Sequence, residues 1–479
     1  MPIALYTNTS FYNDIAEELR LFTDAAVVCA ETPDAADVTV LLDGWTARAQ
    51  ATLAPGRADY SYTHPAVTGS LLVVKRYEKR CVKIAAFRMM QKLYNTATPW
   101  GSLTGIRPTR LYRELLQEGV EAADAMMLDE FDVSPDKLRL AKTITAVQQP
   151  IFATQTPKDV DVYIGVPYCR TRCLYCSFGS EVRGAKTDMC AYLDALKQDI
   201  AYGAAIVRDA GYTLRSVYMG GGTPTVLTAA ELEDVLAFAL DAYGGYGQEF
   251  TVEAGRPDTI DEEKLALLKR LGVGRISINP QSMNADTLER IGRSHSPESI
   301  PAIFAISREI GFTNINMDVI AGLPGEDDAA MRRTLDAIME MEPDNLTVHT
   351  LAIKRSSRLK QCLEQYPLPD AATAESMTRM GAQAAEKMGM RPYYMYRQKY
   401  MRGNLENVGY AVPGKECIYN VDMMEETTSI MAHGAGAMTK RIFGGEHRVE
   451  RIPNPKDVPT YIQKLAWLEK EKRKLFMQE

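Results

Sequence analysis

The sequence contains little cysteine, histidine or tryptophan, and it has no long apolar run. Eight cysteines in 479 residues are too few for a disulfide-dense secreted scaffold. No stretch of about 18 uncharged apolar residues occurs, so a membrane-spanning helix is not expected. The N-terminal segment reaches Asp14 and Glu17 before any apolar run long enough for a signal peptide. We therefore expect a cytoplasmic protein.

An excess of basic residues is also missing. The 55 lysines and arginines against 62 acidic residues give a net charge of −7, which offers no general attraction to nucleic acid or to an anionic membrane. Hydrophobic residues make up 46% of the chain, an ordinary value for a globular protein. The length suits two or three domains.

The pattern of strands and helices changes along the chain and predicts three domains, 1–155, 156–368 and 369–479. In the first, the runs IALYT, VTVLLDG and SLLVVKRY predict short strands, VKIAAFRMMQKLYNTA predicts a helix, and another helix is expected after Pro108. This is a separate α/β module. The third domain is expected to be mainly helical, with a terminal helix at about Pro459–Phe476, and to close over the site described next.

In the middle domain, six short apolar runs alternate with helical patterns: DVYIGV, SVYMG, EFTVEA, GRISIN, INMDVIAG and NLTVHTL. Strands separated by helices predict right-handed crossovers and a parallel sheet. The ligand site of such a sheet lies at the carboxyl ends of its strands. The unusual residues of this domain follow the strands at those ends, so they should meet on one face.

Three of the eight cysteines, Cys169, Cys173 and Cys176, fall within eight residues directly after the first of these strands. A spacing of three and then two residues lets one loop place three thiolates on three irons of a 4Fe–4S cube. The fourth iron is then open to a ligand. A structural zinc site would need a fourth ligand, and the nearest candidates, Cys190 and His295, are distant in sequence. Zinc and a chance cluster remain alternatives at this point.

Other polar residues stand at the ends of the following strands. Gly220-Gly221-Gly222-Thr223-Pro224-Thr225 allows a close backbone approach to a ligand, although a tight turn explains it equally well. Glu253 is either a site carboxylate or the partner of Arg256. Asp318 lies inside an apolar strand, where a carboxylate is costly unless it is paired or functional.

These motifs together resemble the radical S-adenosylmethionine (SAM) superfamily. More narrowly, the chain resembles the oxygen-independent coproporphyrinogen III oxidase family and its HemZ-type branch. The resemblance is carried by YIGVPYCRTRCLYCSF, GGGTPT, VEAGRPDT, INPQSM, NMDVIAGLPGE and VHTLAIKR, with PWGSLTGIRPTRL and YRQKYMRGNLENVGYA on the flanks. It implies a partial (β/α)6 barrel, a 4Fe–4S cluster and SAM. It also implies oxidative decarboxylation of two propionates of coproporphyrinogen III to vinyl groups, with an electron donor of the flavodoxin, ferredoxin or reductase type.

By the same resemblance, Cys169, Cys173 and Cys176 are the cluster ligands. The positions that match SAM contacts are Tyr163, Gly222, Thr223, Glu253, Gln281, Arg293, Asp318 and Ala352. The chain departs from the family pattern at Phe178, where the best-known members have a further cysteine, and at Gly165, where members have a histidine. Both positions lie next to the expected chemistry.

Two other functions use the same scaffold: a haem-binding chaperone, and a radical methyltransferase or ring-opening enzyme that acts on haem. The chaperone branch carries a histidine–asparagine signature, whereas this chain has Arg-Gly-Asn404-Leu-Glu-Asn407 at the corresponding place. A substrate with several propionates needs cations, and the side chains available near the barrel end are Lys354, Arg355, Arg358, Arg397 and Lys399. The sequence assigns none of them a role.

Overall fold

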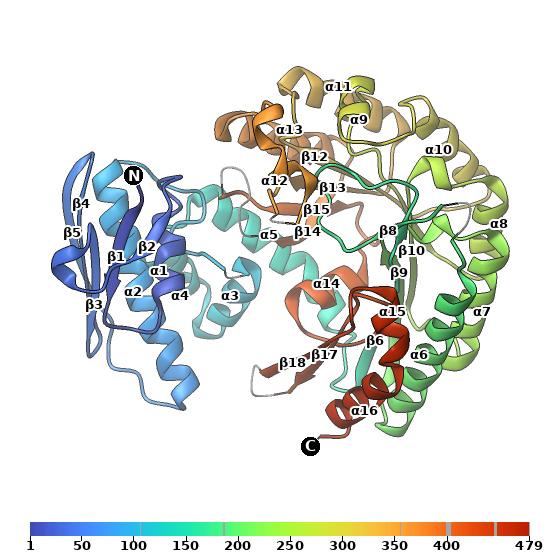
Figure 1. Cartoon of the computed structure of the whole chain (residues 1–479), viewed down its shortest axis with the longest axis horizontal. Coiled ribbons are helices and arrows are strands. Elements are labelled where there is room, and N and C mark those ends of the chain that lie inside the picture. Colours follow the sequence, from blue (N-terminus) through green and yellow to red (C-terminus); the bar gives the residue numbers. More distant parts are fainter. Residues whose placement is uncertain (106, 185–186, 355, 399–403, 445–447, 479) are drawn as a thin grey trace. The chain divides into compact units, whose positions relative to one another are not determined.

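The computed structural model in Figure 1 describes residues 1–105, 107–184, 187–354, 356–398, 404–444 and 448–478. The chain forms two compact units, Met1–Lys142 and Thr143–Glu479, with the boundary inside helix α5 (Pro135–Phe152). The predicted division into three domains stays a prediction. Among the described residues, no helix is both long and apolar enough to cross a membrane.

The first unit is built on a five-stranded sheet in the order β2-β1-β3-β4-β5. The strands are β1 (Ile3–Thr7), β2 (Val27–Cys29), β3 (Val38–Asp43), β4 (Thr46–Leu53) and β5 (Gly56–Thr63). The helices of this unit that precede α5 are α1 (Tyr12–Leu19), α2 (Leu71–Tyr94), α3 (Pro108–Leu115) and α4 (Val120–Ala125). Helix α2 packs against β3, β4 and β5, and α1 packs against α2. The expected α/β module is therefore present.

One predicted strand of this unit is wrong. The run SLLVVKRY is the first part of α2, which begins after Ser70, whose hydroxyl accepts a hydrogen bond from the amide of Val73. Leu71 and Leu72 are 70% and 80% exposed, so the apolar run does not mark a buried strand. Periodicity alone cannot decide whether a short apolar run forms a strand or part of a helix. Here the run belongs to a helix that continues to Tyr94.

The second unit contains an eleven-stranded sheet, and its six central strands are those predicted. They are β6 (Asp159–Val166), β9 (Thr213–Gly221), β10 (Glu249–Gly255), β11 (Arg275–Ile278), β12 (Ile315–Ala321) and β13 (Asn345–Thr350). Each pairs in parallel with the next in that order. The predicted parallel arrangement and the partial (β/α)6 barrel are confirmed.

Helices follow these strands and cover the outer face of the curved sheet (Figure 1). They are α6 (Cys190–Asp209), α7 (Ala229–Tyr243), α8 (Glu262–Arg270), α9 (Ala285–Arg290), α10 (Ser299–Glu309) and α11 (Asp328–Met341). Three of them begin at side-chain caps, Thr228, Asp261 and Asp327, that accept hydrogen bonds from first-turn amides. The loop after β6 forms a small pair of strands, β7 (Tyr168–Cys169) and β8 (Glu181–Val182).

The C-terminal part adds helices, as expected, and also strands that the sequence analysis did not predict. The helices are α12 (Arg358–Gln361), α13 (Ala371–Lys387), α14 (Ile418–Glu425), α15 (Val458–Gln463) and α16 (Leu465–Phe476). The strands are β14 (Arg391–Tyr396), β15 (Asn407–Ala411), β16 (Ser429–His433), β17 (Met438–Phe443) and β18 (Arg448–Pro453). They extend the central sheet at both edges, in the order β14-β15-β13-β12-β11-β10-β9-β6-β16-β17-β18.

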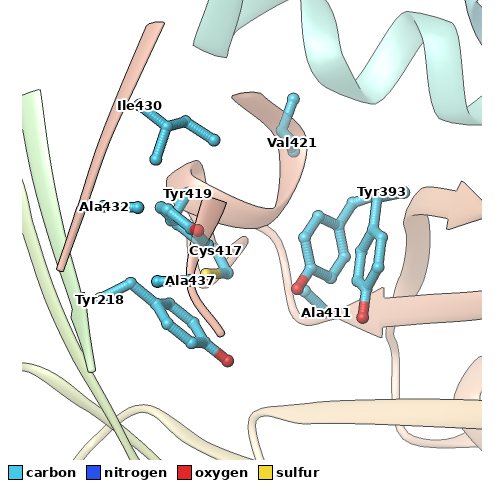
Figure 2. Close-up of a cluster of buried hydrophobic side chains, with 10 residues drawn as sticks. Tyr218, Tyr393, Ala411, Cys417, Tyr419, Val421, Ile430, Ala432 and Ala437 are labelled. Carbon is cyan, nitrogen blue, oxygen red and sulfur yellow. The ribbon is translucent and has the colours of Figure 1, made fainter. Parts of the chain in front are cut away.

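Figure 2 shows how the two sides of this open sheet are joined. Tyr419 and Val421 of α14 lie in one buried cluster with Tyr218 of β9, Ile430 of β16 and Tyr393 of β14. The rings of Tyr218 and Tyr419 stack with their centroids 4.5 Å apart. Helix α14 therefore fills the interior between strands that stand far apart in the sheet order.

Candidate active site

The three cysteines lie on the loop that follows β6. Cys173 is buried, and Cys169 and Cys176 are partly exposed; all eight cysteines of the chain are free thiols. The glycine loop after β9 lies against this segment, since the amide of Thr223 donates to the carbonyl of Tyr168 over 2.8 Å. A Cβ on Gly222 would lie 2.4 Å from that carbonyl oxygen and 2.9 Å from Cys169 Sγ. Only glycine lets the two loops approach so closely.

Hydrogen-bond donors surround the thiols. The Thr223 hydroxyl lies 3.5 Å from Cys169 Sγ, and a guanidinium nitrogen of Arg256 lies 3.9 Å from Cys173 Sγ. Arg293 also stands beside Cys173. Burial raises the pKa of Cys176, and the neighbouring cysteines add to this shift. Two arginine side chains, Arg256 and Arg293, therefore lie beside Cys173.

Among the described residues, no three His, Cys, Asp or Glu side chains converge closely enough to hold a single metal ion. A 4Fe–4S cube makes a different demand, because each thiolate binds its own iron and the sulfurs stay apart. Three free thiols on one loop, one of them buried and two partly exposed, fit that demand. A closed four-ligand zinc site does not match this donor set.

Four of the barrel strands, β6, β10, β12 and β13, each carry one partly exposed side chain near the barrel end. These side chains are Tyr163, Glu253, Asp318 and His349. On β14 the corresponding residue is Tyr396. All five are ionisable or hydrogen-bonding groups. The predicted residues Tyr163, Glu253 and Asp318 are thus on one face, as expected.

Glu253 is not paired with Arg256. Its carboxylate accepts a 2.6 Å hydrogen bond from the Tyr218 hydroxyl, while Arg256 forms a 2.9 Å ion pair with Asp258. Burial raises the pKa of Glu253 to about 7, and the charge of Asp318 adds to this, although the Tyr218 hydrogen bond opposes it. The alternative of a structural salt bridge to Arg256 is therefore wrong.

Asp318 is held by donors from two strands. The Asn316 amide donates to Oδ1 over 2.8 Å, and His349 Nε2 lies 3.5 Å from Oδ2. Burial acts to raise the pKa of Asp318, but hydrogen bonds from His349, Asn316 and Thr347 outweigh it and hold the pKa below its usual value. The carboxylate is therefore charged at neutral pH, and it has lone pairs left to accept further hydroxyl groups.

The remaining predicted residues border the same region. Gln281 is joined to β12 through its backbone, with its amide 2.9 Å from the Asp318 carbonyl oxygen, and its buried Oε1 has no hydrogen-bond partner. Arg293 donates to the Asn279 carbonyl over 2.5 Å and leaves its buried Nε without a partner. Ala352 follows β13 and is partly exposed. Both side chains therefore have hydrogen-bonding capacity left at this end of the barrel.

The two departures from the family pattern have different surroundings. The side chain of Phe178 is 67% exposed, so it does not pack in the interior at the position where family members have a cysteine. A Cβ at Gly165 would lie 3.2 Å from the Tyr163 ring and 3.3 Å from the His433 carbonyl oxygen, so a larger side chain there would require these neighbours to shift.

Of the cations considered for a substrate, Arg355 and Lys399 lie outside the described residues. Burial lowers the pKa of Lys354. Arg397 donates to the Asn404 side-chain oxygen over 2.7 Å, and Arg358 is exposed.

Comparison with known proteins agrees with this geometry. The model of the radical SAM superfamily matches residues 163–338. The chain is 36% identical over 407 residues to the oxygen-independent coproporphyrinogen-III oxidase-like protein HemZ of Bacillus subtilis, covering 84% of this chain and 81% of that protein. The chain belongs to the oxygen-independent coproporphyrinogen III oxidase family of the radical SAM superfamily. Members of this superfamily use a 4Fe–4S cluster and SAM.

Two further comparisons show which other proteins the chain is similar to. The heme chaperone HemW of Bacillus subtilis is 33% identical over 196 residues, which is 40% of this chain and 50% of that protein. The structure of coproporphyrinogen III oxidase (HemN) from Escherichia coli matches with a TM-score of 0.51 at 23% identity, over 68% of this chain and 73% of that chain. The second likeness concerns the fold alone. The chain is thus a radical SAM enzyme of a family that also includes chaperone relatives.

Sequence reasoning missed four residues of this site: Tyr218, Arg256, His349 and Tyr396. Arg256 was considered only as a partner of Glu253. His349 could have been found, because a histidine within the strand NLTVHTL faces the same end as Asp318. Tyr396 had no such signal, because β14 was not predicted as a strand.

Proposed function

We propose that the protein catalyses oxygen-independent oxidative decarboxylation of two propionates of coproporphyrinogen III, giving the vinyl groups of protoporphyrinogen IX. This makes it a coproporphyrinogen dehydrogenase, an oxidoreductase of haem biosynthesis. The family membership supports this proposal, since the HemZ relative matches over most of both chains. The observation that carries it is the meeting of the cysteine loop, the glycine loop and the ionisable side chains at one end of the barrel.

In this proposal Cys169, Cys173 and Cys176 hold the 4Fe–4S cluster. When bound, the cluster supplies the electron that splits SAM into methionine and a 5′-deoxyadenosyl radical. The close approach of the backbone at Gly222 and Thr223 suits the methionine amino group, and Arg293 suits its carboxylate. Asp318 is charged and suits the ribose hydroxyls. The other SAM contacts are Tyr163, Glu253, Gln281 and Ala352.

The overall reaction removes one hydrogen atom from the β-carbon of a propionate, which forms 5′-deoxyadenosine. The carboxylate then leaves as carbon dioxide, and one further electron passes to an acceptor, so that a vinyl group remains. A buried site protects such a radical from water. We place the residues after 368 over the site, and we expect an electron donor of the flavodoxin, ferredoxin or reductase type. The requirement for free thiols indicates the cytoplasm.

The test is anaerobic reconstitution of the cluster, followed by addition of coproporphyrinogen III, SAM and a reductant. Protoporphyrinogen and 5′-deoxyadenosine should form together. Cys173→Ala should abolish both products, whereas the matched variant Cys190→Ala, which removes an exposed cysteine outside the loop, should leave them unchanged.

Two rival outcomes would contradict the proposal. Stable haem binding without a vinyl product would indicate a chaperone, the function named for the HemW relative. Formation of 5′-deoxyadenosine or a methylated product only in the presence of haem would indicate an enzyme that acts on haem itself.

A further inference from the structure

The carboxylate of Asp318 is the first member of a row of three polar side chains, which come from strands β12, β13 and β14; strand β15 lies between the last two. His349 Nε2, on β13, lies 3.5 Å from Asp318 Oδ2 on β12. The hydroxyl of Tyr396, on β14, lies 3.2 Å from the other ring nitrogen of the histidine, Nδ1. All three side chains are partly exposed at the barrel end.

The contacts define the roles of the two histidine nitrogens. A neutral imidazole donates from one nitrogen and accepts at the other. A carboxylate only accepts, so Nε2 carries the proton and donates toward Asp318. In the neutral imidazole Nδ1 is then the acceptor, and the Tyr396 hydroxyl donates to it. Tyr396 therefore selects the histidine tautomer that can hold the carboxylate.

Surrounding contacts fix the row in place. Tyr396 pairs with Asn407 of β15, whose side-chain oxygen accepts a 2.7 Å hydrogen bond from the backbone of Thr350 directly after His349. The ring of Tyr396 also stacks on that of Tyr394 with an interplanar angle of 7°. The imidazole and the phenol are thus anchored to neighbouring strands and do not depend on a ligand for their position.

The second oxygen of Asp318 is held separately. Asn316 donates to Oδ1, and the Thr347 hydroxyl donates to the side-chain oxygen of Asn316 over 3.0 Å. With Asn316 donating to one oxygen and His349 beside the other, the carboxylate plane is fixed while lone pairs remain available. This is the arrangement required of a group that accepts two neighbouring hydroxyls of a ligand.

We propose that His349 is a positioning residue for the nucleoside of SAM, acting through Asp318, and that Tyr396 fixes the tautomer in which it acts. This inference rests on the proposed role of Asp318 at the ribose hydroxyls. It assigns a binding function to two side chains that need not touch SAM themselves.

The test measures SAM affinity by equilibrium dialysis with labelled SAM, on reconstituted holoenzyme without reductant, so that no turnover occurs. His349→Phe should weaken binding by about tenfold or more, as expected for loss of a hydrogen bond to a charged group. His349→Gln retains a donor and should recover most of the affinity. Tyr396→Phe should weaken binding by about threefold, because a neutral hydrogen bond is lost.

The decisive comparison measures the effect of His349→Phe in the Asp318→Asn variant. Asp318→Asn alone should weaken SAM binding, and adding His349→Phe to it should cost less than about twofold more, because the histidine acts through the carboxylate. Tyr410→Phe is the matched control, because Tyr410 is a buried tyrosine of β15 that stands opposite Leu346 and Pro392 in the sheet. This variant should bind SAM as the wild type does.

The outcomes separate the two levels of the proposal. If Asp318→Asn weakens binding but His349→Phe does not, the positioning role is wrong and the ribose assignment stands. If His349→Phe weakens SAM binding as much in the Asp318→Asn variant as in the wild type, the histidine has a merely structural role and the inference is overturned. If Asp318→Asn binds SAM normally, the ribose assignment and the inference are both wrong.

Discussion

The buried ion pair between Lys472 and Asp199 gives the strongest prediction about stability. Lys472 Nζ lies 2.6 Å from Asp199 Oδ1, and both side chains are inaccessible to water, with exposed fractions of 0% and 2%. The pair joins α16 to α6. Burial acts to raise the pKa of Asp199, but Lys472 and His433 outweigh it and hold the pKa well below its usual range.

Lys472→Met should remove the cation and leave the carboxylate charged in the interior. Breaking a buried pair in this way costs about 3–5 kcal/mol. Asp199 keeps hydrogen bonds from the Tyr461 hydroxyl at 2.8 Å and the Gly434 amide at 3.2 Å, so we expect the lower end, about 3 kcal/mol. The lost hydrogen bond from Lys472 to the Ala432 carbonyl acts in the same direction.

The assay is urea denaturation followed by circular dichroism, with the free energy of unfolding obtained from the midpoint at constant slope. Lys474→Met, an exposed lysine on the same helix, is the control and should change stability by less than about 0.5 kcal/mol. The double variant Asp199→Asn, Lys472→Met removes both charges and should be more stable than Lys472→Met. The reasoning is refuted if Lys472→Met costs no more than the control, or if the double variant is less stable than Lys472→Met.

Three further predictions concern the site. Gly222→Ala should lower the iron and sulfide content after reconstitution, because the added Cβ would lie 2.9 Å from Cys169 Sγ and would displace that thiol. A full complement of iron and sulfide in this variant would contradict the argument. Tyr218→Phe removes a hydrogen bond that lowers the pKa of Glu253, so this pKa should rise above about 7 and the pH dependence of SAM binding should move to higher pH, as measured by dialysis across pH 6–9. Burial lowers the pKa of His295 to about 4, so between about pH 4 and 6.5 the unfolded state binds more protons than the folded state. The free energy of unfolding should therefore decrease as the pH is lowered through this range. The urea midpoint of His295→Leu should decrease less over the same range.

Much of the barrel could be predicted because its signals are local. Each of the six parallel strands is a short apolar run bounded by turn residues and followed by a helix, and three of these helices begin at a side-chain cap. The site residues could be placed on one face because parallel strands end at the same edge. The cysteine spacing and the glycine loop are contiguous in sequence, so their joint presence was visible without coordinates.

The parts that could not be predicted depend on distant partners. The run SLLVVKRY is helical because it precedes a buried helix, and its local composition favoured a strand. Strand β15 joins the barrel by antiparallel pairing with β13, and β16 joins it by parallel pairing with β6, and both partners are distant in the sequence. Strands β14, β17 and β18 are then added to these by antiparallel pairing. The choice between pairing Glu253 with Arg256 or with Tyr218 depended on packing, which the sequence does not express.

The sequence by itself thus determined the chemistry available to this protein: three thiols at the spacing of an open cluster, a flexible glycine loop, and carboxylates at strand ends. Only the tertiary structure decided which groups act together. It brought His349 and Tyr396 to Asp318, and Arg256 to Cys173, because hydrogen bonds between strands and burial of charged groups fix side chains from distant segments at distances of 3–4 Å.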